Sequence, residues 1–133
     1  MDLSTLKIDN EPADLQLLNP KTGEKTDIIL HCVGLDSDQF KAVDRQLSKK
    51  RLIDAQRKGG IKRVIQQADF EQIEEDDCQR LAACISGWKN LQEGDKAVKF
   101  STAACIEILK KYPWIKDQVQ EFVSDRANFI KAA

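Results

Sequence analysis

Cysteine and histidine are the residues of this 133-residue chain most able to bind a metal or to act as a nucleophile. The cysteines Cys32, Cys78, Cys84 and Cys105 form no CxxC pair, and His31 is the single histidine. His31 and Cys32 could supply two zinc ligands. Neighbouring residues on a strand point to opposite faces, however, so these two side chains would not easily converge on one ion. We therefore expect buried free thiols, which pack as small apolar side chains, and no metal site.

Two charged segments could bind ions or phosphate. Residues 74–77 read EEDD, but they lack the alternating oxygen ligands and the glycine of a calcium loop, so a solvated helix face is favoured. Lys58, Gly59 and Gly60 form a basic glycine turn, and no strand precedes it as a phosphate-binding loop would require. Because no nucleophile can be paired with a base, we expect no enzyme, no catalytic residue and no cofactor.

Length and charge set the class of protein. A chain of 133 residues is the usual size of one domain, and a formal net charge of -1 gives the whole molecule no attraction to nucleic acid or to anionic membranes. No apolar run approaches the roughly 20 residues of a membrane span, and the first residues lack the layout of a secretion signal. We expect a cytoplasmic protein with one domain over residues 1–133.

The N-terminal part of the chain predicts a β-hairpin. Two short apolar stretches lie on either side of Asn19, Pro20 and Gly23, which are typical turn residues. Residues 28–32 alternate in the manner of a half-buried strand. We therefore predict a flexible arm over residues 1–12, a hairpin over 13–35 and a helical body over 36–133, which together make a mainly α (α+β) fold.

About four amphipathic helices are expected in the helical body. Asp36 or Ser37 can cap the first helix, and Gly59 and Gly60 would end it. The second helix is predicted within residues 61–91, because apolar residues recur there at steps of three and four up to Trp88 and Leu91. The third begins at Ser101 or Thr102, and the last runs from Pro113 to Ile130.

Opposite charges are segregated between the first two helices. Residues 41–58 are mostly basic, whereas residues 69–77 are mostly acidic. Complementarity between these segments, within one chain or between subunits, is the favoured interpretation. The alternative is a nucleic-acid interface on the basic helix, although the neighbouring acidic run would repel the same phosphates.

The last helix carries an apolar stripe that is the candidate partner-binding face. The stripe could equally be core, and both possibilities stay open at this point. Aromatic residues near its two ends could contact a partner with little loss of internal packing. The candidate contact residues are Trp114, Ile115, Val119, Phe122, Phe129 and Ile130.

Several short sequence words occur in a familiar order. They are GLDSDQF at 34–40, GWKNL at 87–91, STAACIEILKKYPWIKDQV at 101–119 and DRANFI at 125–130. In this order they resemble the tail assembly chaperones of long-tailed, siphophage-type bacteriophages. Residues 41–77 carry no such word.

The resemblance implies a non-catalytic phage protein that works in the host cytoplasm and is absent from the mature virion. Such chaperones bind the tape measure protein and keep it in solution until tail tube subunits polymerise around it. They are often made in two lengths by a ribosomal frameshift, and a chain ending soon after DRANFI fits the shorter form. The implied partners are the tape measure protein, the longer frameshifted form, further copies of this chain and the tail tube protein.

Two other classes of phage protein remain open at the level of sequence. A structural tail component, such as a connector or terminator, would use the hairpin for subunit contacts. A small nucleic-acid-binding protein would use the basic helix. Presence in purified virions would favour the first class, and salt-sensitive retention on DNA would favour the second.

Overall fold

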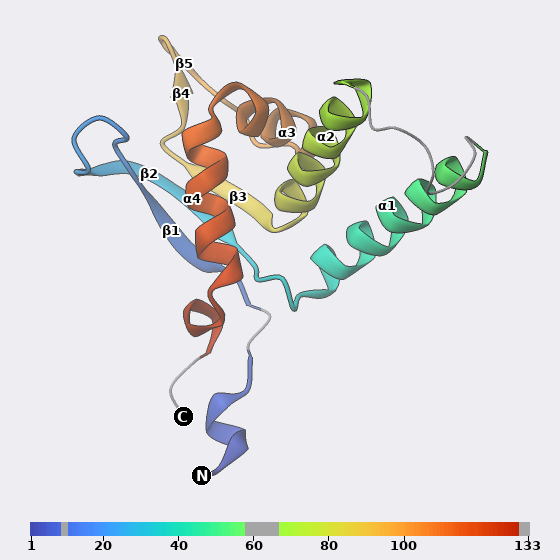
Figure 1. Ribbon diagram of the computed structural model, residues 1–133. Helices are drawn as coiled ribbons and strands as arrows, with labels where there is room; N and C mark the ends of the chain where they lie inside the picture. The colour runs from blue at the N-terminus through green and yellow to red at the C-terminus, as the bar shows by residue number, and fades with distance from the viewer. Residues whose placement is uncertain (9–10, 58–66, 131–133) are drawn as a thin grey trace.

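The computed structural model describes residues 1–8, 11–57 and 67–130. Its described part contains a small antiparallel sheet and four α-helices, and the N-terminal hairpin precedes the helices (Figure 1). The mainly helical α+β fold expected from the sequence is therefore confirmed.

The hairpin forms where the turn residues predict it. Strands β1 (Ala13–Leu18) and β2 (Lys25–Cys32) pair antiparallel. In the turn, the Asn19 side chain accepts a hydrogen bond from the Lys21 amide at 2.8 Å, and the Gly23 amide donates to the Asn19 carbonyl at 2.7 Å. Gly23 has φ of 75°, a left-handed conformation that glycine adopts without a steric penalty.

The sheet has a third strand where the sequence analysis expected helix. Helix α2 (Gln67–Ala83) ends before Cys84, and β3 (Ile85–Lys89) pairs antiparallel with β2. The prediction that one helix continues to Leu91 is thus wrong. The hairpin offers the free edge of β2, and a short apolar run can take either conformation until such an edge is available. Gly87 lies opposite His31 in the pairing of β3 with β2.

Local signals set the helix starts. Helix α1 (Asp38–Arg57) follows Ser37, whose hydroxyl accepts from the Phe40 amide at 3.2 Å. Ser101 caps α3 (Thr102–Lys111) by accepting from the Ala104 amide at 3.0 Å. Helix α4 (Pro113–Ser124) has Pro113 in its first turn, as predicted. The predicted stop of α1 at Gly59 and Gly60 lies outside the described residues.

The last helix is shorter than predicted. It ends at Ser124, and Asp125 then accepts from the Ala127 amide at 3.0 Å and caps a separate 3-10 helix (Arg126–Phe129). An aspartate side chain that bonds to the backbone in this way competes with helix continuation, which explains the break. The segment between β3 and α3 contains a second small hairpin, β4 (Gln92–Glu93) and β5 (Lys96–Ala97).

Helix α4 also secures the open edge of β1. The Gln118 side chain accepts from the Leu18 amide at 2.8 Å and donates to the Leu18 carbonyl at 2.9 Å. One amide side chain thus replaces a neighbouring strand at this residue. In the predicted arm, residues Leu3–Leu6 form a 3-10 helix, and Ile8 makes an isolated bridge with Ile130.

The core lies between the sheet and helices α2, α3 and α4. All four cysteines are buried and unbridged, as the sequence analysis expected. Their burial beside apolar neighbours accounts for their presence as packing residues. Other fully buried side chains are Leu17, Val33, Leu81, Leu109, Val119 and Val123.

Candidate interaction surface

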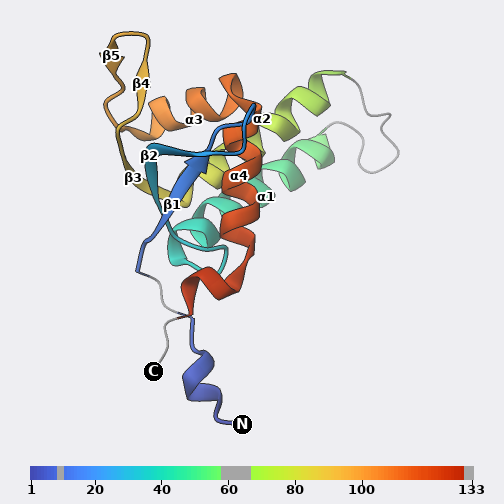
Figure 2. The ribbon, with the colours of Figure 1, turned by 90° about the vertical axis from the view of Figure 1, so that its left-hand side faces the viewer.

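Helices α1 and α2 extend together away from the sheet. In both views the far ends of the two helices point to the same side of the molecule, away from β1, β2 and β3 (Figures 1 and 2). We call α1 and α2 together the helical pair, and its end farthest from the sheet the distal end.

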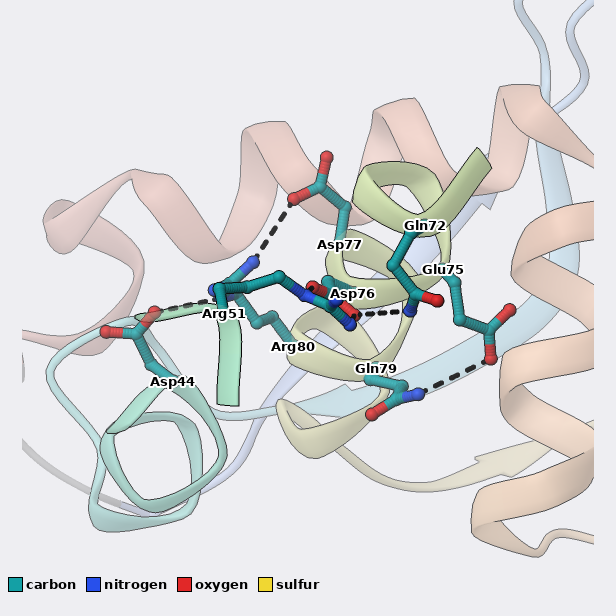
Figure 3. A network of polar contacts seen from close by, with 8 residues as sticks. All are labelled: Asp44, Arg51, Gln72, Glu75, Asp76, Asp77, Gln79 and Arg80. Carbon is teal, nitrogen blue, oxygen red and sulfur yellow. Dashed lines mark hydrogen bonds and ion pairs between the residues drawn. The ribbon is translucent and has the colours of Figure 1, made fainter. Parts of the chain in front are cut away.

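Ion pairs hold the two helices together. Arg51 Nε on α1 lies 2.6 Å from Asp76 Oδ2 on α2, and Gln72 Nε2 donates to the other oxygen of Asp76 at 3.0 Å (Figure 3). A second ion pair joins the helices, in which Arg80 Nε on α2 lies 2.8 Å from Asp44 Oδ1 on α1. The Arg51–Asp76 pair is a contact of the predicted kind within one chain, whereas the Arg80–Asp44 pair has its charges the other way round.

Asp76 is the buried member of this network. Asp76 is only 2% exposed, so burial opposes the ionisation of its carboxyl group. The hydrogen bonds from Arg51 and Gln72 outweigh that effect and hold the pKa of the Asp76 carboxyl below its ordinary value. Asp76 is therefore a charged structural link between α1 and α2.

Large apolar side chains are exposed toward the distal end of the helical pair. Leu52 is 62% exposed, Phe70 57% and Ile73 50%. Ile53 is 40% exposed on α1 as well. Large apolar side chains exposed near one another are typical of interaction sites. We call Leu52, Phe70 and Ile73 the distal apolar surface.

Phe70 and Ile73 share one side of α2. They precede Asp77, whose carboxylate lies 3.6 Å from Arg80, by about two helical turns and about one. That side of α2 therefore continues into apolar residues toward the distal end. Leu52 is exposed on α1 near the same end of the helical pair.

The stripe predicted as the partner-binding face is divided by the structure. Ile115, Val119 and Phe129 are buried, at 3%, 0% and 4% exposure, and belong to the core. Trp114, Phe122 and Ile130 are half-buried. Phe129 packs edge-to-face on Phe122, with ring centroids 5.6 Å apart.

A shallow groove of about 290 Å³ runs between β1 and α4. Leu15, Leu18 and Phe122 supply its apolar lining, and Glu121 and Asp125 supply carboxylates. Phe122 is the candidate contact residue that lines this groove.

The sequence analysis missed the distal apolar surface. Phe70 and Ile73 fall on the apolar stripe of the second predicted helix, whose continuation at Leu81 and Cys84 is buried. Helical periodicity shows that residues share a face, but not how far along the helix a neighbour covers that face. The sequence does hold one signal of exposure. Leu52 lies among basic residues on α1, off the apolar stripe formed by Phe40, Val43 and Leu47.

Comparison with known proteins gives a family. Residues 36–133 match the family described as YdaY prophage protein, and this match spans most of the chain. The chain belongs to the YdaY prophage protein family. No curated protein and no solved structure matches it. Membership shows that the protein is of phage origin, and the matched region contains all four α-helices.

In this YdaY prophage family member, the thiols lie apart from the candidate surface. Desolvation by the core raises the pKa of Cys84 and of Cys105 to about 12, and it raises the pKa of Cys32 further. Over residues 1–8, 11–57 and 67–130, no three His, Cys, Asp or Glu side chains are grouped to hold a metal ion. In the same ranges, no helix is long and apolar enough to cross a membrane.

Proposed function

We propose that this protein is a non-catalytic tail assembly chaperone that binds the tape measure protein during phage tail assembly. The observation that carries the proposal is the distal apolar surface, where Leu52, Phe70 and Ile73 are each at least half exposed. Membership of a prophage family and the likeness of the sequence words to tail assembly chaperones support the same role. The protein would act in the host cytoplasm and leave the tail before the virion is complete.

Client binding follows from the form of the surface. The exposed apolar side chains of the helical pair offer a face on which an amphipathic helix can lay its own apolar side. The expected client segment is thus an amphipathic helix in which apolar residues recur every three or four positions. A holdase needs no nucleophile, only a surface that covers such a helix until the tail tube protein replaces it.

Co-expression with the tape measure protein of the same prophage tests the proposal. The wild-type protein should keep the tape measure protein in the supernatant after centrifugation. The double variant Phe70→Ser with Ile73→Ser should let it sediment, because the variant removes apolar contact area. Leu3→Ser with Leu6→Ser is the matched control, since Leu3 and Leu6 are 77% and 44% exposed on the N-terminal 3-10 helix.

Three results would contradict this function. The first is a tape measure protein that sediments even with the wild-type chaperone. The second is a Phe70 and Ile73 variant that remains fully active. The third is recovery of the protein in purified virions, which would favour a structural tail component.

A nucleic-acid-binding role is the second candidate, because Lys41, Arg45 and Lys49 are exposed on α1. The exposed carboxylates Glu71 and Glu74 on the adjacent α2 oppose that role. Retention of the pure protein on DNA that weakens steeply with salt would favour this candidate.

A further inference from the structure

Strand β1 lies at one edge of the three-stranded sheet, and this edge borders helix α4 (Figure 1). Within β1, the Leu17 carbonyl accepts from the Thr26 hydroxyl of β2 at 2.7 Å, so it points toward the neighbouring strand. The amide and the carbonyl of Leu18 point the opposite way, because both bond to the Gln118 side chain on α4. Backbone groups alternate in direction along a strand, so those of Gln16 also point away from β2. The backbone of Gln16 therefore presents a donor and an acceptor along the outer edge of β1.

The groove between β1 and α4 lies along this edge. Its volume of about 290 Å³ is at the low end for small-molecule pockets, so it suits a few side chains better than a whole cofactor. Leu15, Leu18 and Phe122 form its apolar part, and Leu18 is 41% exposed. A strand edge beside an apolar groove is an arrangement that binds an extended peptide as an added strand.

Two carboxylates also line the groove. Glu121 lies on α4, and Asp125 directly follows the last residue of that helix. Over the described part of the chain, neither carboxylate forms an ion pair. Asp125 Oδ1 accepts from the Ala127 amide at 3.0 Å, and Asp125 Oδ2 can accept a further bond. The complementary group is a lysine or arginine side chain, which donates charge-assisted hydrogen bonds to carboxylates.

We propose that the edge of β1 and the groove beside it bind an extended, basic peptide segment of another protein, which pairs with β1 as a fourth strand. In an extended segment every second side chain faces the same way. The face toward α4 carries an apolar side chain, which enters the apolar part of the groove, and a lysine or arginine beside Glu121 and Asp125. Gln118 ends the site, because its side chain already bonds to the backbone groups of Leu18.

This site differs from the proposed client surface in position and in chemistry. The distal apolar surface would bind an amphipathic helix, whereas the edge of β1 binds an extended, basic segment. The peptide experiment below needs no tape measure protein, and the solubility experiment above changes no residue of the groove. Failure of one proposal therefore leaves the other standing.

A synthetic peptide with the sequence Thr-Val-Thr-Lys-Thr-Val-Thr, blocked at both ends, tests the site. As a strand it places valine and lysine on one face and threonine on the other. Its binding should slow the hydrogen exchange of the Gln16 amide, measured by NMR on the isotope-labelled protein. The same peptide with glutamate in place of lysine should bind roughly tenfold more weakly or worse, because like charges then meet in the groove.

Backbone methylation of the peptide distinguishes strand pairing from other modes of binding. Two peptides, each N-methylated at one of the two alternating sets of residues, lose the amide donors along one edge or the other. At least one of them should bind roughly tenfold more weakly than the unmodified peptide, because an added strand donates to β1 from one edge only.

Variants of the protein test the two parts of the groove. Leu18→Ser should weaken binding of the lysine peptide by roughly fivefold or more through lost apolar contact. Leu6→Ser is the matched control, since Leu6 is 44% exposed on the N-terminal 3-10 helix. Glu121→Gln with Asp125→Asn should weaken binding by roughly fivefold, and asparagine at 125 can still cap the 3-10 helix.

Asp95→Asn with Glu107→Gln is the matched control for the charge change, because both residues are exposed and neither lines the groove. Both control variants should bind the lysine peptide like the wild type, and circular dichroism should show that every variant is folded. Exchange of the Gln16 amide that the lysine peptide leaves unchanged would overturn the proposal. So would equal binding of the glutamate peptide, or full binding of both methylated peptides. Protection of the Gln16 amide that rises with protein concentration alone would assign the edge to a second copy of the chain instead.

Discussion

At the scale of single residues, exposure separates two phenylalanines that look alike in the sequence. Both Phe70 and Phe129 lie on apolar helical stripes. Phe129 is 4% exposed, and its ring reaches within 2.9 Å of the position that a Cβ on Gly34 would occupy, whereas Phe70 is 57% exposed. The absence of a side chain at Gly34 therefore makes room for Phe129, and Phe70 is available for contact with other molecules.

Alanine replacement should show this difference directly. Phe129→Ala should lower the free energy of unfolding by about 3–5 kcal/mol, because it leaves a cavity in the core. Phe70→Ala, the matched control, should change it by less than about 0.5 kcal/mol in the monomer. Urea unfolding at low protein concentration measures both values. Similar losses for the two variants would contradict the assignment of Phe129 to the core and Phe70 to the surface.

At the scale of elements, the pairing of α1 with α2 depends on charges rather than on a wide apolar seam. Of the large apolar side chains on α1, Leu47 is buried and Phe40 is half-buried, while Leu52 is mostly exposed. The pairs Arg51–Asp76 and Arg80–Asp44 supply further links between the helices. We therefore expect the position of α1 to depend on pH.

Acid should weaken the Asp76 link. Because the pKa of Asp76 in the folded protein lies below its ordinary value, the link stabilises the fold above about pH 4 and is lost as the pH falls through that lowered pKa. At neutral pH, Asp76→Asn should cost about 2 kcal/mol, between the values for exposed and for fully buried pairs. The difference between wild type and variant should shrink in acid.

The neighbouring Asp77 provides the control for Asp76. The Asp77 side chain is 48% exposed and lies 3.6 Å from Arg80, so Asp77→Asn should cost less than about 1 kcal/mol at any pH. Urea unfolding across a pH series measures both variants. Equal losses for Asp76→Asn and Asp77→Asn would show that the buried link does not join the helices as described.

At the scale of the whole molecule, the core joins distant parts of the chain. Cys32 on β2, Cys84 before β3 and Cys105 on α3 are buried together with Cys78 on α2. The residues of this core come from both the hairpin and the helical body. Sheet and helices should therefore unfold as one unit, while the distal end of the helical pair lies outside that core.

The reactivity of the four cysteines tests whether the sheet and the helices unfold as one unit. In the native protein, none of the four thiols should react with a disulfide reagent except through unfolding, because each is buried and its raised pKa keeps it protonated. In denaturant, all four should react. Added chelator should leave helicity unchanged. One bound zinc per chain, lost together with helicity, would contradict the packing role.

The sequence by itself determined the elements whose signals are local. Asn19 and Gly23 specify the hairpin turn, Ser37 and Ser101 cap α1 and α3, and Pro113 begins α4. Each of these signals acts through hydrogen bonds or backbone angles within a few residues. Such signals do not depend on the rest of the fold, so they could be interpreted without it.

Only the tertiary structure decided which apolar residues are covered. Residues 85–89 became a strand because the edge of β2 was free to pair with them, and no local signal reports a distant edge. Ile115 and Phe129 are buried whereas Phe70 and Leu52 are exposed, although all four are apolar residues in amphipathic segments. Periodicity predicts the face that a helix prefers to bury, but the position and length of its neighbours decide how much of that face is buried.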